Sequence, residues 1–305
     1  MLPTRILLAV SFGSLCLLSL TSHAGDLDAL VEKMRKVTSD DSSSGAYKAR
    51  EELVNEAQKI GAPAIPALLS LLHDEHKSVR NLAGEALRDI DGLTEDQLDT
   101  LIEARASGVN NLGPAIARIG TPKAADYLAG QFFKEREAGS DSDYGMQKLG
   151  KNAVPRLLQF YQTEEGWDDK LEGAADSTFA ALSAEAADAI EPLRKLALDE
   201  GASEAMRIRA ISALGSIGLT ATAATPDLQK LQRGENGRLS EAANKAILQM
   251  GGPEAADILT QRLEQATKDP FAQTLLMRDI SELRTNGRRA GPILRKYLGS
   301  GDWDV

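Results

Sequence analysis

Cysteine is almost absent from this sequence, which holds a single one, Cys16, in 305 residues. Cys16 lies in an N-terminal segment that we expect to be removed, so the mature chain has neither a thiol nor a disulfide. This excludes a cysteine nucleophile, thiolate metal sites and redox switching. An exported chain without cysteine also fits a bacterial periplasm better than a disulfide-rich extracellular setting.

Aromatic residues are scarce as well, at 4% of the chain. The apolar residues are mostly alanine, leucine and isoleucine, which favour helices packed through small side chains and disfavour a β-sandwich. The length allows two ordinary domains, or one elongated array in which repeated units replace a single closed core.

Basic residues are outnumbered, 35 against 45 acidic ones, which gives a formal net charge of −10. Loss of Arg5 with the N-terminal segment takes this charge to −11. An acidic body repels nucleic-acid phosphates, so we expect no nucleic-acid partner and favour basic or neutral partners.

Histidine occurs three times, and only His73 and His76 lie outside the N-terminal segment. Their spacing allows a metal site in principle, but no further ligands follow at a suitable spacing. A Ser-His-Asp triad assembles in space and stays open by spacing alone, yet the chain lacks a Gly-x-Ser-x-Gly elbow, a dinucleotide fingerprint and a phosphate loop. We therefore predict a polar turn at 73–76, no cofactor, no metal and no enzymatic activity. A paired-carboxylate hydrolase stays open because carboxylates are abundant.

Asp141, Asp143 and Gly145 resemble part of a calcium-binding loop. The match fails because the glycine comes one position early, the third acidic ligand is missing and position 12 is Asn152 rather than glutamate. We predict that residues 137–145 form a solvated acidic loop. Residues 39–45, SDDSSSG, are a second polar stretch and a second predicted loop.

Residues 1–24 have the three parts of a secretory signal peptide. Arg5 supplies the positive start, residues 6–20 are apolar and uncharged, and residues 21–24 end in a small residue, Ala24, with another two positions earlier. The apolar run is shorter than the ~20 residues that span a bilayer. We predict cleavage after Ala24 and export to the periplasm, with an extracellular protein or an uncleaved N-terminal anchor as alternatives. No integral membrane segment then remains, and peripheral contact with the envelope stays open.

An internal period runs along the rest of the chain. Seven segments end in a large apolar residue that is followed by glycine or a close substitute, at intervals of 30, 29, 30, 33, 35 and 33 residues. Glycine in this place ends a helix, because it accepts the left-handed conformation without a steric cost. The seven predicted helix ends are Ile60-Gly61, Ile90-Asp91, Ile119-Gly120, Leu149-Gly150, Leu182-Ser183, Ile217-Gly218 and Met250-Gly251.

Each period contains two helical patterns, which are clearest in residues 61–90. In GAPAIPALLSLLHD, apolar residues fall at i, i+3, i+4 and i+7, and two prolines lie in the first turn. In SVRNLAGEALRDI, the apolar residues again form one stripe, with polar residues on the opposite face. Glycines and a proline weaken the pattern over 95–150. The same plan predicts helix pairs at 153–161 and 171–182, 186–198 and 206–217, 226–232 and 239–250, and 253–265 and 271–283.

Residues 66–91, PALLSLLHDEHKSVRNLAGEALRDID, resemble a HEAT repeat, including the form found in phycobilisome-lyase-like repeat proteins. The matching features are the early Pro66, the turn residue Asp74 and Val79-Arg80 at the start of the second helix. The step from Asp74 to Arg80 resembles the family's aspartate–arginine pair, which ties one repeat to the next. Residues 207–218, RIRAISALGSIG, match the second helix almost as well. The resemblance implies an all-α fold, a right-handed α-α superhelix or α-solenoid of about eight helix pairs over residues 25–305, clearest over 61–91 and 151–251.

In such arrays the second helices line the concave side, so the resemblance and the helical phase imply that their polar positions form a protein-binding surface. The candidates are Asn81, Glu85, Arg88, Arg209, Ser212, Glu241, Asn244 and Lys245. Residues 278–296 also carry six basic and two acidic residues. This basic stretch, which includes Arg288 and Arg289, is a second candidate contact, for an acidic partner or anionic headgroups. The pattern at 291–298 predicts a last, unpaired first helix, which is either a cap or an apolar face for a partner.

Taken together, these features predict a non-enzymatic scaffold or adaptor of the envelope that binds a protein partner. A cofactor-handling lyase or chaperone-like protein is one alternative, because some phycobilisome-lyase-like repeat proteins have that role. Export and the lack of cysteine argue against it. A regulatory subunit of an exported enzyme is the other alternative.

Overall fold

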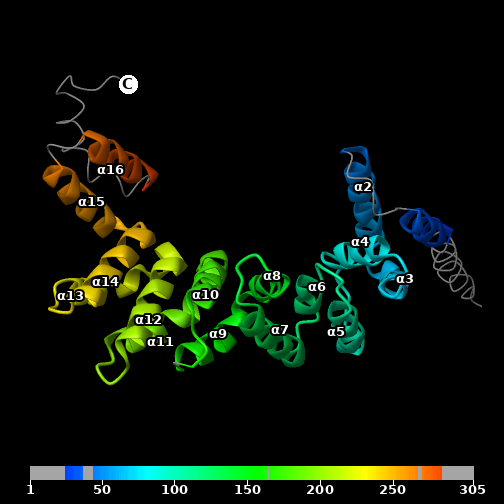
Figure 1. The fold of residues 1–305 in the computed structure, drawn as a ribbon, viewed down its shortest axis with the longest axis horizontal. Helices are drawn as coiled ribbons and strands as arrows, with labels where there is room; N and C mark the ends of the chain where they lie inside the picture. The colour runs from blue at the N-terminus through cyan, green and yellow to red at the C-terminus, as the bar shows by residue number, and fades with distance from the viewer. Residues whose placement is uncertain (1–24, 37–43, 164, 267–269, 284–305) are drawn as a thin grey trace, which may run out of the picture. The chain divides into compact units, whose positions relative to one another are not determined.

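The computed structural model describes residues 25–36, 44–163, 165–266 and 270–283 (Figure 1). Within these ranges the chain is built from helices and contains no β-strand, which confirms the predicted all-α helical-repeat fold. The predicted signal peptide, residues 37–43 and the C-terminal residues from 284 onward lie outside the described residues. Arg288, Arg289 and the predicted helix at 291–298 are among the latter. Of the predicted loop at 39–45, the two described residues, Ser44 and Gly45, belong to helix α2.

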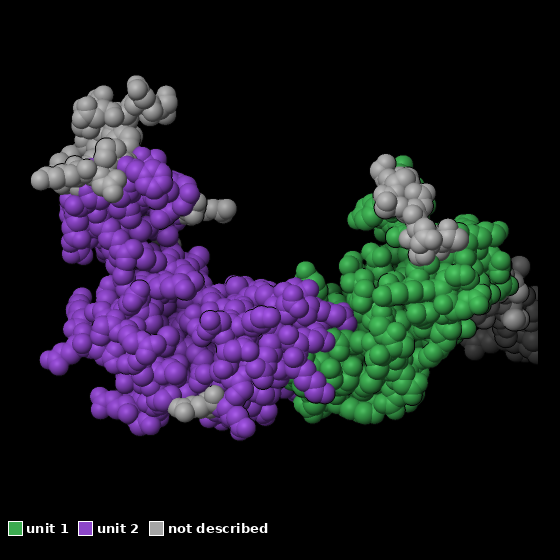
Figure 2. Space-filling model, viewed as in Figure 1, with its two compact units in different colours: residues 1–131, 144–149 green, residues 132–143, 150–305 purple. Residues whose placement is uncertain are grey.

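The chain divides into two compact units, coloured separately in Figure 2. Unit 1 comprises residues 1–131 and 144–149, and unit 2 comprises residues 132–143 and 150–305. Unit 1 starts its described part with helical residues 25–35. Its further elements are α2 (Ser44–Ile60), η1 (Ala62–Ala64), α3 (Ile65–Leu71), α4 (Lys77–Leu87), η2 (Glu95–Gln97), α5 (Leu98–Ala106) and α6 (Gly113–Arg118).

Two helices, α7 (Pro122–Glu135) and α8 (Asp141–Lys148), contribute residues to both units. Unit 2 then alternates short 3₁₀ turns with pairs of α-helices. Its elements are η3 (Gly150–Ala153), α9 (Val154–Tyr161), α10 (Asp169–Leu182), η4 (Ser183–Ala186), α11 (Ala187–Leu198), α12 (Glu204–Ile217), η5 (Gly218–Ala224), α13 (Thr225–Gln232), α14 (Gly237–Met250), α15 (Pro253–Gln265) and α16 (Pro270–Glu282).

The helix pairs expected in unit 2 are all present, and their ends agree with the predicted ranges to within two residues. In each pair we call the earlier helix the first helix and the later one the second helix. First helices are α9, α11, α13 and α15, and second helices are α10, α12, α14 and α16. Pro155 and Pro226 lie in the first turn of α9 and α13, where a missing N–H leaves no bond unmade.

Most of the predicted helix ends are followed by a residue with a positive φ. Gly218, for example, has a φ of 76° where α12 ends, and Ser183 has a φ of 44° where α10 ends. The predicted end at Ile90 differs slightly, because the positive φ falls on Gly92 and not on Asp91. The period seen in the sequence therefore marks a repeated positive φ at the helix ends.

Small residues let the second helices of unit 2 approach closely. Ala210 and Ala213 of α12 and Ala246 of α14 have no solvent exposure. A Cβ atom added to Gly215 of α12 would lie 2.9 Å from the Cα atom of Ala246 and 2.5 Å from the side-chain oxygen of Gln249. The α12–α14 contact thus depends on a residue without a side chain, which fixes the spacing of the surface described below.

The predicted acidic loop at 137–145 is wrong for its second half. Residues 141–148 form α8, and Ser142 and Asp143 are fully buried. Thr178 of α10 donates a 2.7 Å hydrogen bond to Asp143, and the backbone N–H of Gly139 donates another. These donors offset the cost of burying a carboxylate, which the acidic composition of the segment alone does not reveal.

Candidate functional site

The second helices of unit 2 start at side chains that cap the backbone. Asp168, Ser203 and Asn236 precede α10, α12 and α14, and each side chain accepts a hydrogen bond from a backbone N–H of the first turn. Caps of this kind contribute about 1 kcal/mol each. The cap hydrogen bond from Leu171 lowers the pKa of Asp168, and the guanidinium of Arg136, 3.0 Å away, lowers it further. The caps set where each second helix begins and therefore which side chains share a face.

A second fixed contact joins the two helices of a repeat. Arg80 of α4 donates to the backbone carbonyls of Asp74 and Glu75, and Arg207 of α12 donates to the carbonyl of Ala197 at 3.0 Å. These arginines occupy the same place in their repeats, ten residues before Ile90 and Ile217. Their bonds satisfy carbonyls at or beyond the end of the first helix, which lack intrahelical partners.

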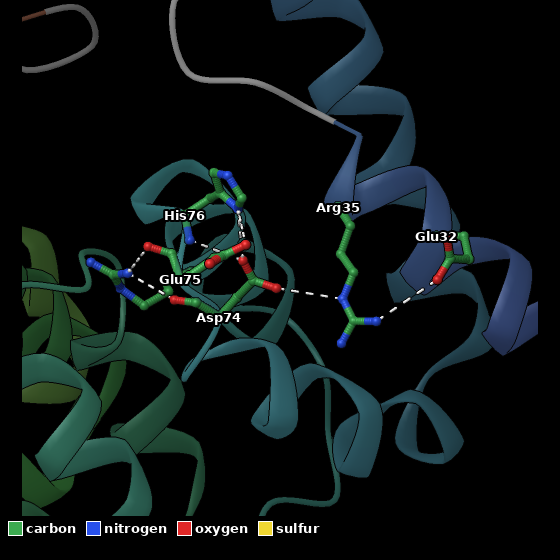
Figure 3. Close-up of polar contacts among 6 residues, drawn as sticks. Glu32, Arg35, Asp74, Glu75 and His76 are labelled. Carbon is green, nitrogen blue, oxygen red and sulfur yellow. Dashed lines mark hydrogen bonds and ion pairs between the residues drawn. The ribbon is translucent and has the colours of Figure 1, made fainter.

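The residues of the predicted Asp74–Arg80 pair are in contact, but Arg80 donates to the backbone carbonyl of Asp74 and not to its carboxylate. The Asp74 carboxylate accepts from the backbone N–H of His76 and lies 3.4 Å from Nε of Arg35 (Figure 3). The hydrogen bond from the His76 N–H lowers the pKa of Asp74 most, and the His76 ring and Arg35 lower it further. The predicted polar turn at 73–76 thus connects the helical residues 25–35 to the α3–α4 pair.

A half-buried carboxylate, that of Asp176 on α10, lies against α12. Ser212 Oγ donates to Asp176 Oδ2 at 2.6 Å. The pKa of Asp176 is raised to about 6, mainly by burial and also by the charge of Glu172. The hydrogen bond from Ser212 and the charge of Lys245 oppose this rise. Because Lys245 belongs to α14, this carboxylate interacts with residues of three successive second helices.

The hydroxyl of Tyr161 on α9 interacts with the same carboxylates. Tyr161 is 1% exposed, and its burial raises the pKa of the phenol well above the usual value. The charges of Asp176 and Glu172 raise it further, and that of Arg209 opposes them. First and second helices therefore meet at a buried polar group and not only at apolar side chains.

Trp167, in the turn before α10, packs against both Tyr161 and Arg209. The guanidinium of Arg209 lies over the Trp167 ring, 4.5 Å from its centroid, and donates to the carbonyl of Thr163 at 3.2 Å. The Trp167 ring meets that of Tyr161 edge-on, with 4.9 Å between centroids. A buried cation is held here by an aromatic face and a backbone carbonyl.

Two cavities border these residues. One of about 340 Å³ lies between first helices α9 and α11, and one of about 190 Å³ lies at the start of α10 and α12. The larger is lined by Leu158, Tyr161, Gln162, Pro192, Leu193, Lys195, Leu196 and Asp199. The smaller is lined by Trp167, Asp168, Asp169, Glu172, Ala205, Ile208, Arg209 and Arg238.

The predicted candidates in unit 2 fall into two groups. Ser212, Glu241 and Lys245 lie on the accessible side of α12 and α14, and Glu241 and Lys245 are exposed. Arg209 is 7% exposed and is held inside the repeat, and Asn244 accepts a hydrogen bond from Gln232 of the first helix α13. Ser212 donates a hydrogen bond to Asp176 and the charge of Lys245 acts on the same carboxylate, while Arg209 packs against Trp167.

The predicted candidates in unit 1 lie on α4 and at its end. Asn81 and Glu85 are partly exposed, and the Asn81 side chain accepts a hydrogen bond from the backbone N–H of Asn110. Arg88 pairs with its neighbour Asp89, and its carbonyl accepts from Arg118. Asn81 and Arg88 therefore form hydrogen bonds between successive repeats, whereas Glu85 is a partly exposed residue of α4.

Sequence reasoning missed Asp176, Tyr161 and Trp167. Asp176 has a usable signal, because it lies six residues before Leu182, next to the position that holds Ser212 and Lys245 in the following repeats. Tyr161 and Trp167 have a weaker one, as aromatic residues in a chain with few of them. Their contacts join residues that are up to 48 positions apart and do not follow from a local pattern.

Among the described residues, no group of three or more histidine, cysteine, aspartate or glutamate side chains is arranged to hold a metal ion. In the same part of the chain, no helix is long and apolar enough to cross a membrane.

Comparison with known proteins identifies the repeat. Residues 190–277, which span α11 to α16, match the family model of HEAT repeats. No curated protein matches the chain. Among solved structures, a designed armadillo repeat protein is 22% identical, with 72% of this chain and 99% of that chain covered and a TM-score of 0.29. Another, in complex with the peptide (KR)4, is 17% identical, with the same coverages and TM-score.

A third structure, of computationally designed armadillo repeat proteins for modular peptide recognition, is 19% identical over 73% of this chain and 99% of that chain, with a TM-score of 0.27. At these scores no property of the designed proteins is carried over to this chain. The family match coincides with the helix pairs, the helix ends with a positive φ and the repeated caps described above. Residues 190–277 of the chain are therefore HEAT repeats.

Proposed function

We propose that this protein is a non-catalytic scaffold that binds another protein through the polar side of its second helices. We name this the second-helix surface and define it by polar residues on three successive second helices. Its members are Glu172, Asp176 and Ser177 of α10, Ser212 of α12, and Glu241 and Lys245 of α14.

The observation that carries the proposal is the register of this surface. Ser177, Ser212 and Lys245 lie five residues before Leu182, Ile217 and Met250, where their helices end, and all three are partly or fully exposed. The apolar faces of the same helices are buried in the repeat core. Repeated helices that present one position after another form an extended binding surface without any catalytic group.

Site-specific photo-crosslinking in cells tests this proposal. A photoreactive amino acid at Glu241 or Lys245 should give one discrete protein adduct. The same amino acid at Lys195 of α11 or Lys230 of α13, which are exposed on first helices, should not. Equal adducts from both sets, or none from Glu241 and Lys245, would contradict a partner on the second-helix surface. A coloured or cofactor-bearing purified protein would favour the lyase-like alternative.

Export is part of the same proposal and has its own test. The pattern in residues 1–24 supports a signal peptide, so the mature protein should start at Gly25 and be released with the periplasmic fraction. N-terminal sequencing of the purified protein checks the first statement. A chain that keeps Arg5 and sediments with membranes would favour the N-terminal anchor.

A further inference from the structure

Asp176 and Tyr161 contain polar atoms that are shut off from solvent. Oδ1 of Asp176 and the hydroxyl oxygen of Tyr161 are both inaccessible, and neither has a hydrogen-bond partner among the described residues. The other oxygen of Asp176 accepts a hydrogen bond from Ser212 across the α10–α12 junction. A buried carboxylate with one oxygen that has no donor is a costly arrangement when it is ionised.

The charges that face Asp176 come from every helix around it. Glu172 lies one turn earlier on α10, so two carboxylates share one side of that helix. Arg209 of α12 acts on Tyr161 of α9, and Lys245 of α14 acts on Asp176. Ser212 and Ser216 of α12 supply neutral hydrogen bonds to the carboxylate. The positive charges partly offset the repulsion from Glu172 but leave Oδ1 without a donor.

A proton on Asp176 removes both penalties at the junction. The neutral acid is less costly to bury than the ion, and it is not repelled by Glu172. Opening the α10–α12 contact to water relieves the same penalties while the group stays ionised. The closed junction is thus favoured by the protonated form, and the opened junction by the ionised form.

We propose that Asp176 is a proton-controlled latch between α10 and α12, which closes the second-helix surface when Asp176 takes up a proton and loosens it when the proton is lost. The link to partner binding rests on the proposed function of that surface. The latch itself is a property of the free protein and is tested without a partner.

The sign and size of the effect follow from proton linkage. The pKa of Asp176 is about 6 in the closed junction and 3.8 for an ordinary aspartate. The penalty of ionisation is therefore fully present above pH 6 and fades as the pH falls from 6 towards 3.8. Between pH 7.5 and 5.0 the population of the opened junction should fall about tenfold.

Hydrogen exchange of the full mature protein measures this opening. After correction for the chemical exchange rate, backbone amides of α10 and α12 should be about tenfold better protected at pH 5.0 than at pH 7.5. Amides of α15 in the same molecule should show a ratio near one. The variant Asp176→Asn should be equally protected at both pH values, because its side chain does not titrate.

Asp227→Asn is the matched control in the same unit. Lys230 and Arg194 hold the pKa of Asp227 below its ordinary value, so Asp227 does not titrate between pH 5.0 and 7.5. This variant should lose protection equally at both pH values and keep the tenfold ratio in α10 and α12. A ratio near one in the wild type, or a tenfold ratio that survives in Asp176→Asn, would overturn the proposal.

A carboxyl-carbon NMR titration of the wild type keeps the test valid if Asp176→Asn does not fold. The latch requires that Asp176 titrate near pH 6, and titration near pH 4 would overturn it. A negative hydrogen-exchange result would overturn the latch but would not change the photo-crosslinking result. A negative photo-crosslinking result would overturn partner binding at this surface but would not change the hydrogen-exchange result.

Discussion

The guanidinium of Arg209 lies over the indole ring of Trp167, 4.5 Å from the ring centroid, although the two residues belong to different repeats. Arg209 is 7% exposed, and it extends from the second helix of one repeat to the turn that precedes the second helix of the repeat before. This contact is a structural joint within unit 2.

The joint should be measurable as a coupling between the two side chains. Arg209→Met keeps the apolar stem but removes the charge, and we expect it to lower the free energy of unfolding by about 1–2 kcal/mol. In a Trp167→Leu background the same change should cost about 1 kcal/mol less, because the ring is already gone. Chemical unfolding of the four proteins gives the coupling. Strictly additive losses would mean that the stacking contributes nothing.

Gly215 and Gly173 should respond in opposite ways to the same substitution. An added Cβ at Gly215 meets backbone of Ala246 at 2.9 Å, so Gly215→Ala should cost about 1–3 kcal/mol by forcing α12 and α14 apart. Gly173 on α10 has no neighbour within 4 Å of an added Cβ, and Gly173→Ala should gain about 0.5–1 kcal/mol of helix stability. Thermal unfolding followed by circular dichroism compares the two variants. A loss in both would show that the α12–α14 spacing is not the cause.

In unit 1, the contact between Asp74 and Arg35 should weaken in acid (Figure 3). The pKa of Asp74 is lower in the folded protein than its ordinary value of 3.8. The ionised carboxylate therefore stabilises the folded state above pH 3.8, and this stabilisation is lost as the pH falls through the lower, folded pKa. Asp74→Asn should speed hydrogen exchange in residues 25–35 at pH 7 and have less effect at pH 3. Glu75→Gln, at a side chain that is 86% exposed, is the control and should leave exchange unchanged at pH 7. A pH-independent effect of Asp74→Asn would rule out the ionised contact.

The repeat could be predicted from sequence because its determinants are local. Pro226 in a first turn, Gly218 after a helix and the apolar stripe between such points act within about one helical turn, and each is where the pattern predicts it. The helix at 141–148 could not be predicted, because the burial of Asp143 depends in part on a hydrogen bond from Thr178, 35 residues later. Asp176 was missed for a related reason, since its burial depends on α9 and α12 rather than on its own helix.

The exposure of the candidate residues could be predicted only in part, because local and distant effects both decide it. Helical phase placed Ser212 and Lys245 on the accessible face correctly. It also placed Arg209 there, yet Arg209 lies within the repeat because Trp167 and the Thr163 carbonyl hold it. Phase predicts which side of a helix a residue occupies, but not which distant group it meets.

Binding of a protein partner to the second-helix surface can be measured by calorimetric titration of the partner identified by crosslinking against wild type, Lys245→Glu and Lys195→Glu. Both substitutions reverse one exposed charge, the first on second helix α14 and the second on first helix α11. We expect about tenfold or more loss of affinity for Lys245→Glu, roughly 1.4 kcal/mol, and less than about twofold for Lys195→Glu. Equal affinities for all three proteins, or a selective loss in Lys195→Glu, would contradict binding at the second-helix surface.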